Sequence, residues 1–388
     1  MENTTDSRTH IFDHSRTSLK EALTRVGLKP FRADQVWQWV YKKGVINPAE
    51  MTNLSKSDQE KLQTAVDFTL PEISTEQQAT DGVLKWLLKL HDGQEVEMVL
   101  IPQGKRGTLC VSSQVGCTLT CRFCHTGTQA LARNLTAGDI IAQVWIAKSR
   151  MADFTDDDTA RRLTNIVFMG MGEPLYNKDN VFNACKTLMD DKGLAMGGRK
   201  ITISTSGVVP EIPAIGEELG TNLAISLHSA DNEIRTKIMP LNKKYPLEEL
   251  KKAVDNFKLR EHRRITWEYV MLKDVNDSKE AADKLIEFIK PYPSLVNLIP
   301  FNPWPGSPFE CSDEETMRAF RNRISAAGID VTLRQTRGED ILAACGQLRS
   351  ESSGRNTVSL QYPTVVAVYG NEKQREKVEN VKVHFEET

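Results

Sequence analysis

The stretch TLCVSSQVGCTLTCRFC, residues 108–124, decides how the rest of the sequence is interpreted. It holds four of the seven cysteines of the chain, and three of them, Cys117, Cys121 and Cys124, follow a strand-like run with the spacing C-x3-C-x2-C. Thiolates this close in sequence can bind one soft metal centre together. The odd number and wide spread of the cysteines argue against a disulfide scaffold. We therefore expect cysteines that are reduced or metal-bound.

Zinc and an iron–sulfur cluster are the two metal centres that this spacing allows. Structural zinc needs four ligands, and the sequence contains no second CxxC pair to complete the set. His125 directly follows Cys124, which places it poorly for chelating the same ion. An iron–sulfur cubane normally takes four thiolates, so three would leave one iron with an open coordination site. The cluster is the preferred interpretation, and zinc stays open as the alternative.

Beyond the cysteine loop the sequence alternates between strand-like and helix-like segments. Apolar runs predict strands at 108–112, 164–169, 200–205, 223–227, 266–271, 296–300 and 330–333. Helical periodicity predicts helices at 138–150, 179–190, 247–258, 279–290 and 314–327. This alternation indicates a parallel sheet with crossover helices, either a full or partial (β/α) barrel or a doubly wound sheet. Because the motifs follow the strands, as in the loops at the C-terminal face of a barrel, we prefer the barrel.

The chain is expected to divide into five parts along its length. In the helical part, Val36, Trp39 and Val40 are predicted to share one helix face. In the hairpin, alternation places Glu97 away from the apolar face, either in solvent or in a cavity. The parts are a disordered N-terminus (1–17), a helical accessory domain (18–70), a β-hairpin extension (71–103), the barrel (104–349) and an atypical C-terminal tail (350–388).

Composition excludes several classes of protein. The 388 residues carry 50 Lys+Arg and 52 Asp+Glu, a net charge of -2. This balance excludes a disordered polyelectrolyte and a generally basic nucleic-acid binder, so any binding of nucleic acid needs a local patch. No apolar run approaches the ~20 residues of a membrane span, and no secretory signal is present, so we expect a cytoplasmic protein. Basic residues gather at 105–106, 199–200, 243–244, 258–264 and 334–337.

A second motif, MGMGEPL at residues 169–175, follows the next predicted strand. Its glycines let the backbone approach a ligand closely, and the Glu173 carboxylate can accept hydrogen bonds from a ligand ammonium. Together with the three-cysteine loop, the motif resembles the radical S-adenosylmethionine (SAM) superfamily. The resemblance implies a [4Fe-4S] cluster on Cys117, Cys121 and Cys124, with SAM bound to the open iron.

Further motifs resemble one branch of that superfamily. They are TLCVSSQVGC (108–117), MGMGEPL (169–175), ISTSGVVP (203–210), AISLH (224–228), NLIPFNP (297–303), ACGQL (344–348) and, near the N-terminus, KPFRADQ (29–35). In this order they resemble the RlmN family of bacterial RNA adenine C2-methyltransferases, which belong to the radical SAM superfamily. The resemblance implies an α/β fold, a partial (β/α)6 barrel with a small N-terminal helical domain.

The resemblance also implies a reaction in two stages, because C2 of adenine is not a nucleophile. One SAM molecule methylates Cys345. A second SAM, bound to the cluster, is cleaved to a 5′-deoxyadenosyl radical that takes a hydrogen atom from this S-methyl group. The carbon radical then adds to C2, and Glu97 is the implied acceptor of the C2 proton. Attack by Cys110 on the Cys345 sulfur releases methylated RNA and leaves a disulfide.

Ligand contacts and partners follow from the same resemblance. Gly172 and Glu173 are expected to hold the amino end of SAM. The expected contacts to its ribose, carboxylate or adenine are Ser204, Ser226, Leu227, His228 and Asn302. The implied substrates are 23S ribosomal RNA in the peptidyl-transferase region and transfer RNA beside the anticodon. We also expect a monomer and an electron donor such as flavodoxin. Since the base must be unstacked to reach a buried radical, single-stranded RNA is favoured over duplex.

Two alternatives of different kinds stay open. A Cfr-type enzyme shares the two-cysteine mechanism but methylates adenine at C8. A zinc-stabilised RNA-binding protein would have no catalytic activity. The tail at 350–388 departs from the family pattern, since its five basic residues face six acidic ones. That balance does not support an RNA contact by the tail.

Overall fold

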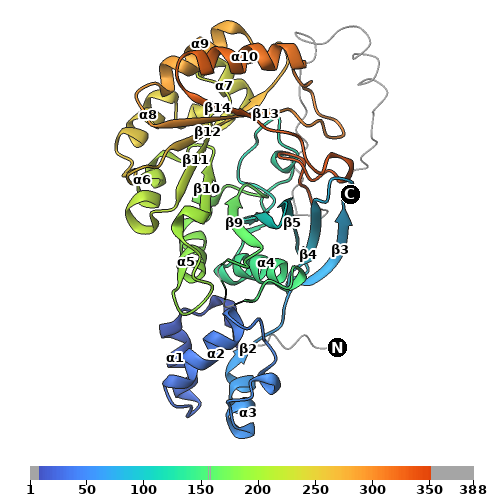
Figure 1. Ribbon diagram of the computed structural model, residues 1–388, viewed down its shortest axis with the longest axis vertical. Helices are drawn as coiled ribbons and strands as arrows, with labels where there is room; N and C mark the ends of the chain where they lie inside the picture. The colour runs from blue at the N-terminus through green and yellow to red at the C-terminus, as the bar shows by residue number, and fades with distance from the viewer. Residues whose placement is uncertain (1–7, 156, 158, 351–388) are drawn as a thin grey trace, which may run out of the picture.

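The computed structural model describes residues 8–155, 157 and 159–350. Its centre is a ten-stranded sheet with the order β14-β13-β12-β11-β10-β9-β6-β5-β4-β3 (Figure 1). The seven strands from β6 to β14 pair in parallel, and each lies within two residues of a predicted strand. They are β6 (Arg106–Cys110), β9 (Leu163–Phe168), β10 (Ile201–Thr205), β11 (Asn222–Ser226), β12 (Ile265–Met271), β13 (Ser294–Pro300) and β14 (Asp330–Leu333).

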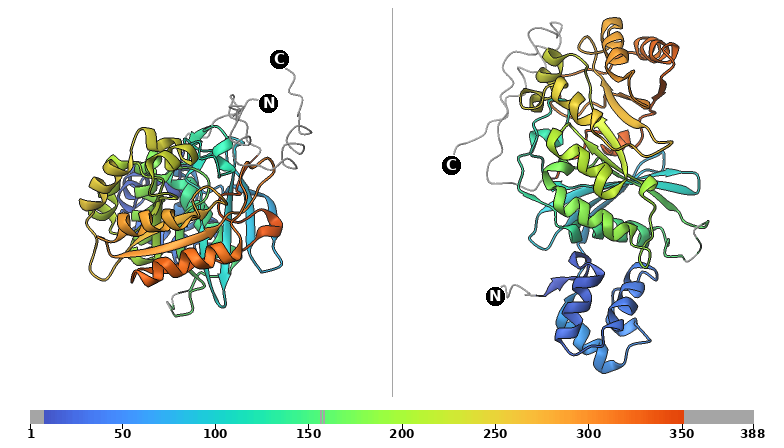
Figure 2. Two further views of the ribbon diagram at one scale, coloured as in Figure 1. Left: turned by 90° about the horizontal axis from the view of Figure 1, so that it is seen from above. Right: turned by 90° about the vertical axis from the view of Figure 1, so that its left-hand side faces the viewer.

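Helices connect the parallel strands and lie along the outside of the curved sheet (Figure 2). The five predicted helices are present, with ends within three residues of the prediction. Four of them bury one apolar stripe each, as Leu250 and Val254 do in α8, whereas α4 is buried on all sides along most of its length. Because β14 and β3 form the two edges of the sheet, the parallel part is a partial barrel, which confirms the predicted fold class. The helices are α4 (Ala137–Arg150), α5 (Lys178–Met189), α8 (Leu247–Asp255), α9 (Lys279–Ile289) and α10 (Glu314–Ala326), with the shorter α6 (Ile212–Ala214) and α7 (Asn232–Ile238) between them.

Three helices form a lobe at the opposite end of the molecule from α9 and α10 (Figures 1 and 2). They are α1 (Arg16–Arg25), α2 (Phe31–Tyr41) and α3 (Lys56–Ala65). The predicted helix face is partly wrong, because Trp37 is buried and Trp39 is only half-buried. Trp39 instead donates its indole N–H to Asn53 Oδ1 at 2.6 Å. The buried stripe of α2 follows positions i, i+1 and i+4, which the i, i+3, i+4 assignment overlooked.

The expectation of a disordered segment over 1–17 is wrong for its second half. Strand β1 (Thr9–His10) pairs in parallel with β2 (Val66–Asp67). Ile11 and Phe12 are fully buried, and Phe12 contacts the rings of the lobe and of α4. Two apolar residues among polar neighbours are too short a signal for periodicity, yet their burial anchors this segment. The first seven residues lie outside the described part of the chain.

The hairpin extension is a three-stranded antiparallel addition to the same sheet. Strands β4 (Leu84–Lys89) and β5 (Glu95–Gln103) were predicted, and β3 (Glu72–Gln78) was missed. The sequence of β3 is polar because the strand forms an exposed edge, so it carries no apolar alternation. Strand β5 pairs with β6, which joins the extension to the barrel. The tail beyond residue 350 lies outside the described residues. Across the described ranges, no helix is long and apolar enough to span a membrane.

Candidate active site

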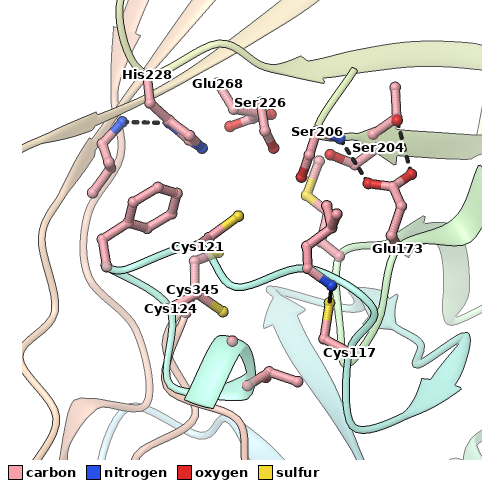
Figure 3. Close-up of a pocket in the computed structure, with 18 of the residues that line it drawn as sticks. Cys117, Cys121, Cys124, Glu173, Ser204, Ser206, Ser226, His228, Glu268 and Cys345 are labelled. Atoms are coloured by element: carbon pink, nitrogen blue, oxygen red, sulfur yellow. Dashed lines mark hydrogen bonds between the residues drawn. The ribbon is translucent and has the colours of Figure 1, made fainter. Parts of the chain in front are cut away.

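The three clustered cysteines line one cavity at the carboxyl ends of β9 to β13 (Figure 3). A two-stranded hairpin, β7 (Gln114–Val115) with β8 (Arg133–Asn134), holds the loop that carries them. Inside the loop, the Gln114 side chain donates to Thr118 Oγ1 at 2.8 Å and accepts the Thr118 N–H at 3.2 Å. Gly127 packs on this loop so tightly that a Cβ there would lie 2.6 Å from the Cys121 carbonyl oxygen. The sequence around the cysteines therefore shapes a fixed loop.

One further group of potential metal ligands occurs among the described residues. The ligand atoms of His10, Asp67 and His91 all lie within 4.8 Å of one another. Both ring nitrogens of His10 are hydrogen-bonded to backbone groups, so that group is not a ready metal site.

The thiols of the loop are protonated without a metal. Burial raises the pKa of Cys121 to about 12, and burial also raises the pKa of Cys117 well above its usual value. Metal ions bind thiolates, so binding would release these protons. The donor set therefore fits a cluster whose positive charge replaces the protons.

Glu173 forms one wall of the cavity and is almost completely buried. Its Oε1 accepts hydrogen bonds from Thr205 Oγ1 at 2.8 Å and from the Leu175 N–H at 3.1 Å. Its Oε2 accepts the Ser206 N–H at 2.8 Å, which leaves acceptor capacity on that oxygen. Burial raises the pKa of this carboxyl, while the three hydrogen bonds oppose the shift. Such a fixed carboxylate can receive a ligand ammonium.

The residue before Glu173, Gly172, must be a glycine. Its φ is +98°, and a Cβ would lie 2.5 Å from Gln114 Cβ. No other residue fits this position without moving the cysteine loop. The motif at 169–175 therefore joins the glutamate wall to the loop that carries the cysteines.

His228 lies on the opposite wall of the cavity from Glu173 (Figure 3). His228 Nδ1 accepts the Val270 N–H at 3.0 Å, so the neutral ring carries its proton on Nε2. Burial lowers the pKa of His228 to about 3 and keeps it neutral. Ser204 and Ser226, at the ends of β10 and β11, line the same cavity. Leu227 is buried beside the cavity, with its backbone N–H bonded to the Glu268 carbonyl oxygen.

Two buried charged residues of this site escaped the sequence analysis. Glu268, on β12, lines the cavity, and its Oε2 has no hydrogen-bond partner in the part of the chain that the structure covers. Burial raises the pKa of Glu268. Arg235 donates to the carbonyl oxygens of Leu227 and Ser206 and so fixes the ends of β11 and β10. A carboxylate inside the apolar run ITWEYVM at 265–271 was the available signal for Glu268.

A second cavity adjoins the first and contains the other two motif cysteines. Cys110 and Cys345 both line it, together with Asn302 and Arg334. Met169, Ile299 and Cys345 belong to the walls of both cavities, so Cys345 lies at their boundary. Burial raises the pKa of Cys110 to about 12, and the nearby Cys345 contributes to this. The pKa of Arg334 is raised, first by the charge of Cys345, and a hydrogen bond to the Cys345 sulfur contributes.

Glu97 lies on the wall of neither of these cavities and is not exposed to solvent. It is buried on β5, where it forms an ion pair with Lys85. The alternation in β5 was therefore misleading, because both faces of this strand are covered. The expected solvent or cavity position is corrected to a buried ion pair.

Most of the predicted basic patches lie away from the cysteines. Residues 105–106, 199–200 and 258–264 come just before β6, β10 and β12, at the amino ends of the strands. There Arg264 pairs with Asp330, and Arg263 donates to the Gly220 carbonyl oxygen at 2.6 Å. These residues therefore do not flank the cavity of the cysteines. The pairs at 243–244 and 334–337 are the ones on the carboxyl side of the sheet.

Comparison with known proteins assigns the family. Residues 111–286 match the model of the radical SAM superfamily, and residues 9–67 match that of the ribosomal RNA large subunit methyltransferase N-terminal domain. The chain is 49% identical over 362 residues to the dual-specificity RNA methyltransferase RlmN of Rhizorhabdus wittichii, which covers 92% of this chain and 90% of that protein. The chain belongs to the RlmN family of radical SAM RNA methyltransferases. This membership confirms the resemblance.

Other relatives agree with the RlmN assignment. RlmN of Rhodospirillum rubrum is 52% identical over 340 residues, which is 87% of this chain and 79% of that one. A solved radical SAM methyltransferase from Sphaerobacter thermophilus is 39% identical and superimposes with a TM-score of 0.82, over 88% of this chain and 99% of that one. Membership in the radical SAM superfamily implies a [4Fe-4S] cluster and SAM, and the cavity with three cysteines fits both.

Proposed function

We propose that this chain methylates C2 of adenine in 23S ribosomal RNA and in transfer RNA, in the peptidyl-transferase region and beside the anticodon respectively. The names of the RlmN relatives, dual-specificity RNA methyltransferases, support two RNA substrates. These substrates place the enzyme in the cytoplasm. The observation that carries the proposal is the position of Cys345 at the boundary between the cavity of the cluster cysteines and the cavity of Cys110.

The first cavity is proposed to hold SAM on the cluster. Cys117, Cys121 and Cys124 would bind three irons, with Gly172 and Glu173 at the amino end of SAM. The orphaned Glu268 Oε2 needs a donor, and SAM carries an ammonium and two ribose hydroxyls. Ser204, Ser226 and His228 would make the further polar contacts to SAM. Leu227 lies between Ser226 and His228 in the chain and is fully buried. When bound, the cluster and SAM supply a radical that can take a hydrogen atom from a methyl thioether.

The second cavity is proposed to receive the adenine. The Cys345 sulfur first accepts a methyl group from SAM, beside the Arg334 guanidinium in the same cavity. The methyl carbon, after loss of one hydrogen atom, then forms the bond to C2. Asn302 lines the second cavity, so its amide is placed for the adenine edge as much as for SAM. Two SAM molecules are consumed for each methyl group delivered.

Glu97 and Cys110 are proposed to complete the reaction. The addition leaves an unpaired electron on the ring, which the oxidised cluster would take up, and Glu97 accepts the proton that C2 loses. Cys110 then loses its proton and attacks the Cys345 sulfur, which breaks the carbon–sulfur bond and forms a disulfide, while the released carbon takes up a proton and becomes the methyl group. A donor such as flavodoxin returns the two electrons that reduce it. The N-terminal lobe and the basic residues at 243–244 and 334–337 would hold the RNA, with one chain as the functional unit.

The Cfr-type alternative differs only in the adenine carbon that is methylated. The test is anaerobic reconstitution of the full chain with iron, sulfide and SAM, followed by reaction with 23S ribosomal RNA and transfer RNA. Mass spectrometry of digested RNA should find 2-methyladenosine in both, and 8-methyladenosine would support the Cfr-type activity. Cys345→Ala should abolish methylation, and Cys110→Ala should trap a covalent protein–RNA adduct. A chain that binds zinc but no iron would support the non-catalytic alternative.

A further inference from the structure

A buried ion pair joins β4 and β5 beneath the segment that carries Cys345. Lys85 Nζ lies 3.0 Å from Glu97 Oε1, and the two side chains are only 10% and 8% exposed. The register pairs Lys85 with Val99 and Leu87 with Glu97, which puts both charges on one face of the sheet. Burying two charges carries a large desolvation penalty, so stabilisation of the fold does not by itself account for this ion pair.

The pair reaches the Cys345 segment on both sides of the cysteine. Lys85 Nζ donates to the Leu342 carbonyl oxygen at 3.4 Å, three residues before Cys345. Glu97 Oε2 accepts the Arg349 N–H at 2.8 Å, four residues after it. One ion pair therefore connects the two ends of a short loop that has the methyl-carrying cysteine near its middle.

The loop is held by hydrogen bonds rather than by regular structure, among them Gln347 Nε2 to the Pro303 carbonyl oxygen at 2.8 Å and Gln129 Nε2 to Ser350 Oγ at 2.9 Å. Residues 342–350 contain neither helix nor strand, and Leu342 and Gly346 both adopt positive φ, +52° and +83°. On the side away from the ion pair, the His125 N–H donates to the Gly346 carbonyl oxygen at 2.7 Å. The loop is thus held between the cysteine loop and the ion pair, and the ion pair closes its base.

The charged and titratable groups around Glu97 come from three elements. They are Lys85 on β4, Arg349 in the loop, and His125 in the cysteine loop, whose Nε2 lies 3.2 Å from Arg349 Nη1. Burial raises the pKa of Glu97, and Lys85 is the largest opposing influence. Without Lys85, Glu97 would hold its proton to higher pH and would bind the Arg349 N–H more weakly.

We infer that Lys85 is a positioning residue for the methyl-carrying cysteine, which acts by clamping the loop at 342–349 together with Glu97. The inference rests on the proposed function, in which Cys345 carries the methyl group and Glu97 accepts a proton. The clamp also links proton transfer to the disulfide step. When Glu97 takes up the C2 proton, it loses its charge and both of its bonds weaken. The loop is then released at the stage at which Cys110 must reach the Cys345 sulfur.

The clamp can be tested without cofactor or RNA. Hydrogen–deuterium exchange on the full chain would follow peptides that cover 342–350 in the wild type, Lys85→Met, Lys85→Arg and Glu97→Gln. Lys89→Met is the matched control, because Lys89 lies exposed on the same strand. Exchange should be at least about tenfold faster in Lys85→Met and Glu97→Gln, the effect of losing a hydrogen bond to a charged group. Lys85→Arg and the control should stay near the wild type.

A second measurement separates a positioning role from general destabilisation. With reconstituted enzyme, the acidic limb of the pH profile of RNA methylation should move to higher pH in Lys85→Met and return in Lys85→Arg. The double variant Lys85→Met/Glu97→Gln removes both buried charges, so it should fold as the wild type does and still show fast exchange at 342–350. Protection of the loop in that folded double variant overturns the clamp.

The outcomes for the two proposals are distinct. Unchanged exchange and an unchanged pH profile in Lys85→Met, in a wild type that methylates RNA, overturn the clamp and leave the proposed function standing. A wild type that methylates neither Cys345 nor RNA overturns the proposed function, whatever the exchange data show.

Discussion

Trp304 stacks on His125, with ring centroids 4.8 Å apart and ring planes inclined by 5°. The Trp304 indole N–H also donates to the Phe123 carbonyl oxygen at 3.1 Å. Since His125 in turn holds Gly346, this stack connects the segment after β13 to the cysteine loop and to the Cys345 turn. Trp304 and His125 therefore support both the cysteine loop and the turn that carries Cys345.

Replacement of Trp304 by Ala should loosen that support. Loss of a buried indole destabilises a protein by about 3–5 kcal/mol, and here the loss falls on the cysteine loop. We expect a lower midpoint in denaturant unfolding and at least about tenfold slower methylation of Cys345, a few kcal/mol of lost positioning. Trp304→Phe keeps a stacking ring but lacks the N–H. Its unfolding midpoint and its rate of Cys345 methylation should lie between those of the wild type and Trp304→Ala. Equal methylation rates in all three proteins would contradict this role.

The pH dependence of the reaction should report Glu97. Its pKa is raised by burial against the opposing effect of Lys85. Glu97 can accept a proton only above that raised pKa, so the RNA step should slow as pH falls toward it, at higher pH than an exposed glutamate would give. Methylation of Cys345 does not use this base, so its rate should fall less steeply as pH is lowered, through the weakened clamp alone. Rates of both steps, measured by mass spectrometry between pH 5 and 9, check the prediction; an equal fall in both steps would be evidence against Glu97 as the base.

Arg334 should matter for both cysteine reactions. It lines the second cavity with Cys345 and Cys110, and its pKa is raised by the charges of both. Arg334→Gln removes the positive charge, so we expect methylation of Cys345 and closure of the disulfide to slow by roughly 10- to 100-fold, as for loss of one charged contact in the site. Arg323→Gln is the control, because Arg323 pairs with Asp283 on the outside of the sheet. An Arg334→Gln enzyme as fast as the control would exclude this role.

Glu268 gives a prediction in which stability and binding change in opposite directions. Its buried Oε2 has no hydrogen-bond partner among the described residues, which costs free energy of folding. Glu268→Gln keeps the shape but removes the buried charge, so the free energy of unfolding should rise by about 1 kcal/mol. If SAM donates to Oε2, the dissociation constant for SAM should increase about tenfold, measured by equilibrium dialysis on reconstituted protein. Unchanged SAM binding would show that Glu268 faces another group.

Much of the fold follows from the sequence because parallel strands and crossover helices leave strong periodic signals. The seven parallel strands contain short apolar runs, and most of the long helices bury one stripe. The polar edge strand β3 and the short β1 have no such signal, since their positions depend on pairing with distant segments. Local patterns do not contain that information.

The site was predictable only where its residues belong to contiguous motifs. One cavity is lined by residues from four separate motifs, namely Cys117, Cys121, Cys124, Gly172, Glu173, Ser204, Ser226 and His228. The roles of Lys85, Arg235, Glu268 and Arg334 were missed, because they depend on which side chains the fold brings together and not on a contiguous motif. The partner of Glu97 illustrates this, since only the register of β4 on β5 reveals Lys85 beside it.

The most direct test of the account follows the methyl carbon through Cys345. The reconstituted enzyme would be given SAM that carries a CD3 group, and the masses of the protein and of the RNA product would be measured by mass spectrometry. The account predicts that Cys345 first gains the CD3 group, and that the methyl group on adenine keeps two of the three deuterons, because one leaves as a hydrogen atom. A product that retains all three deuterons, or RNA methylation by Cys345→Ala, would contradict it.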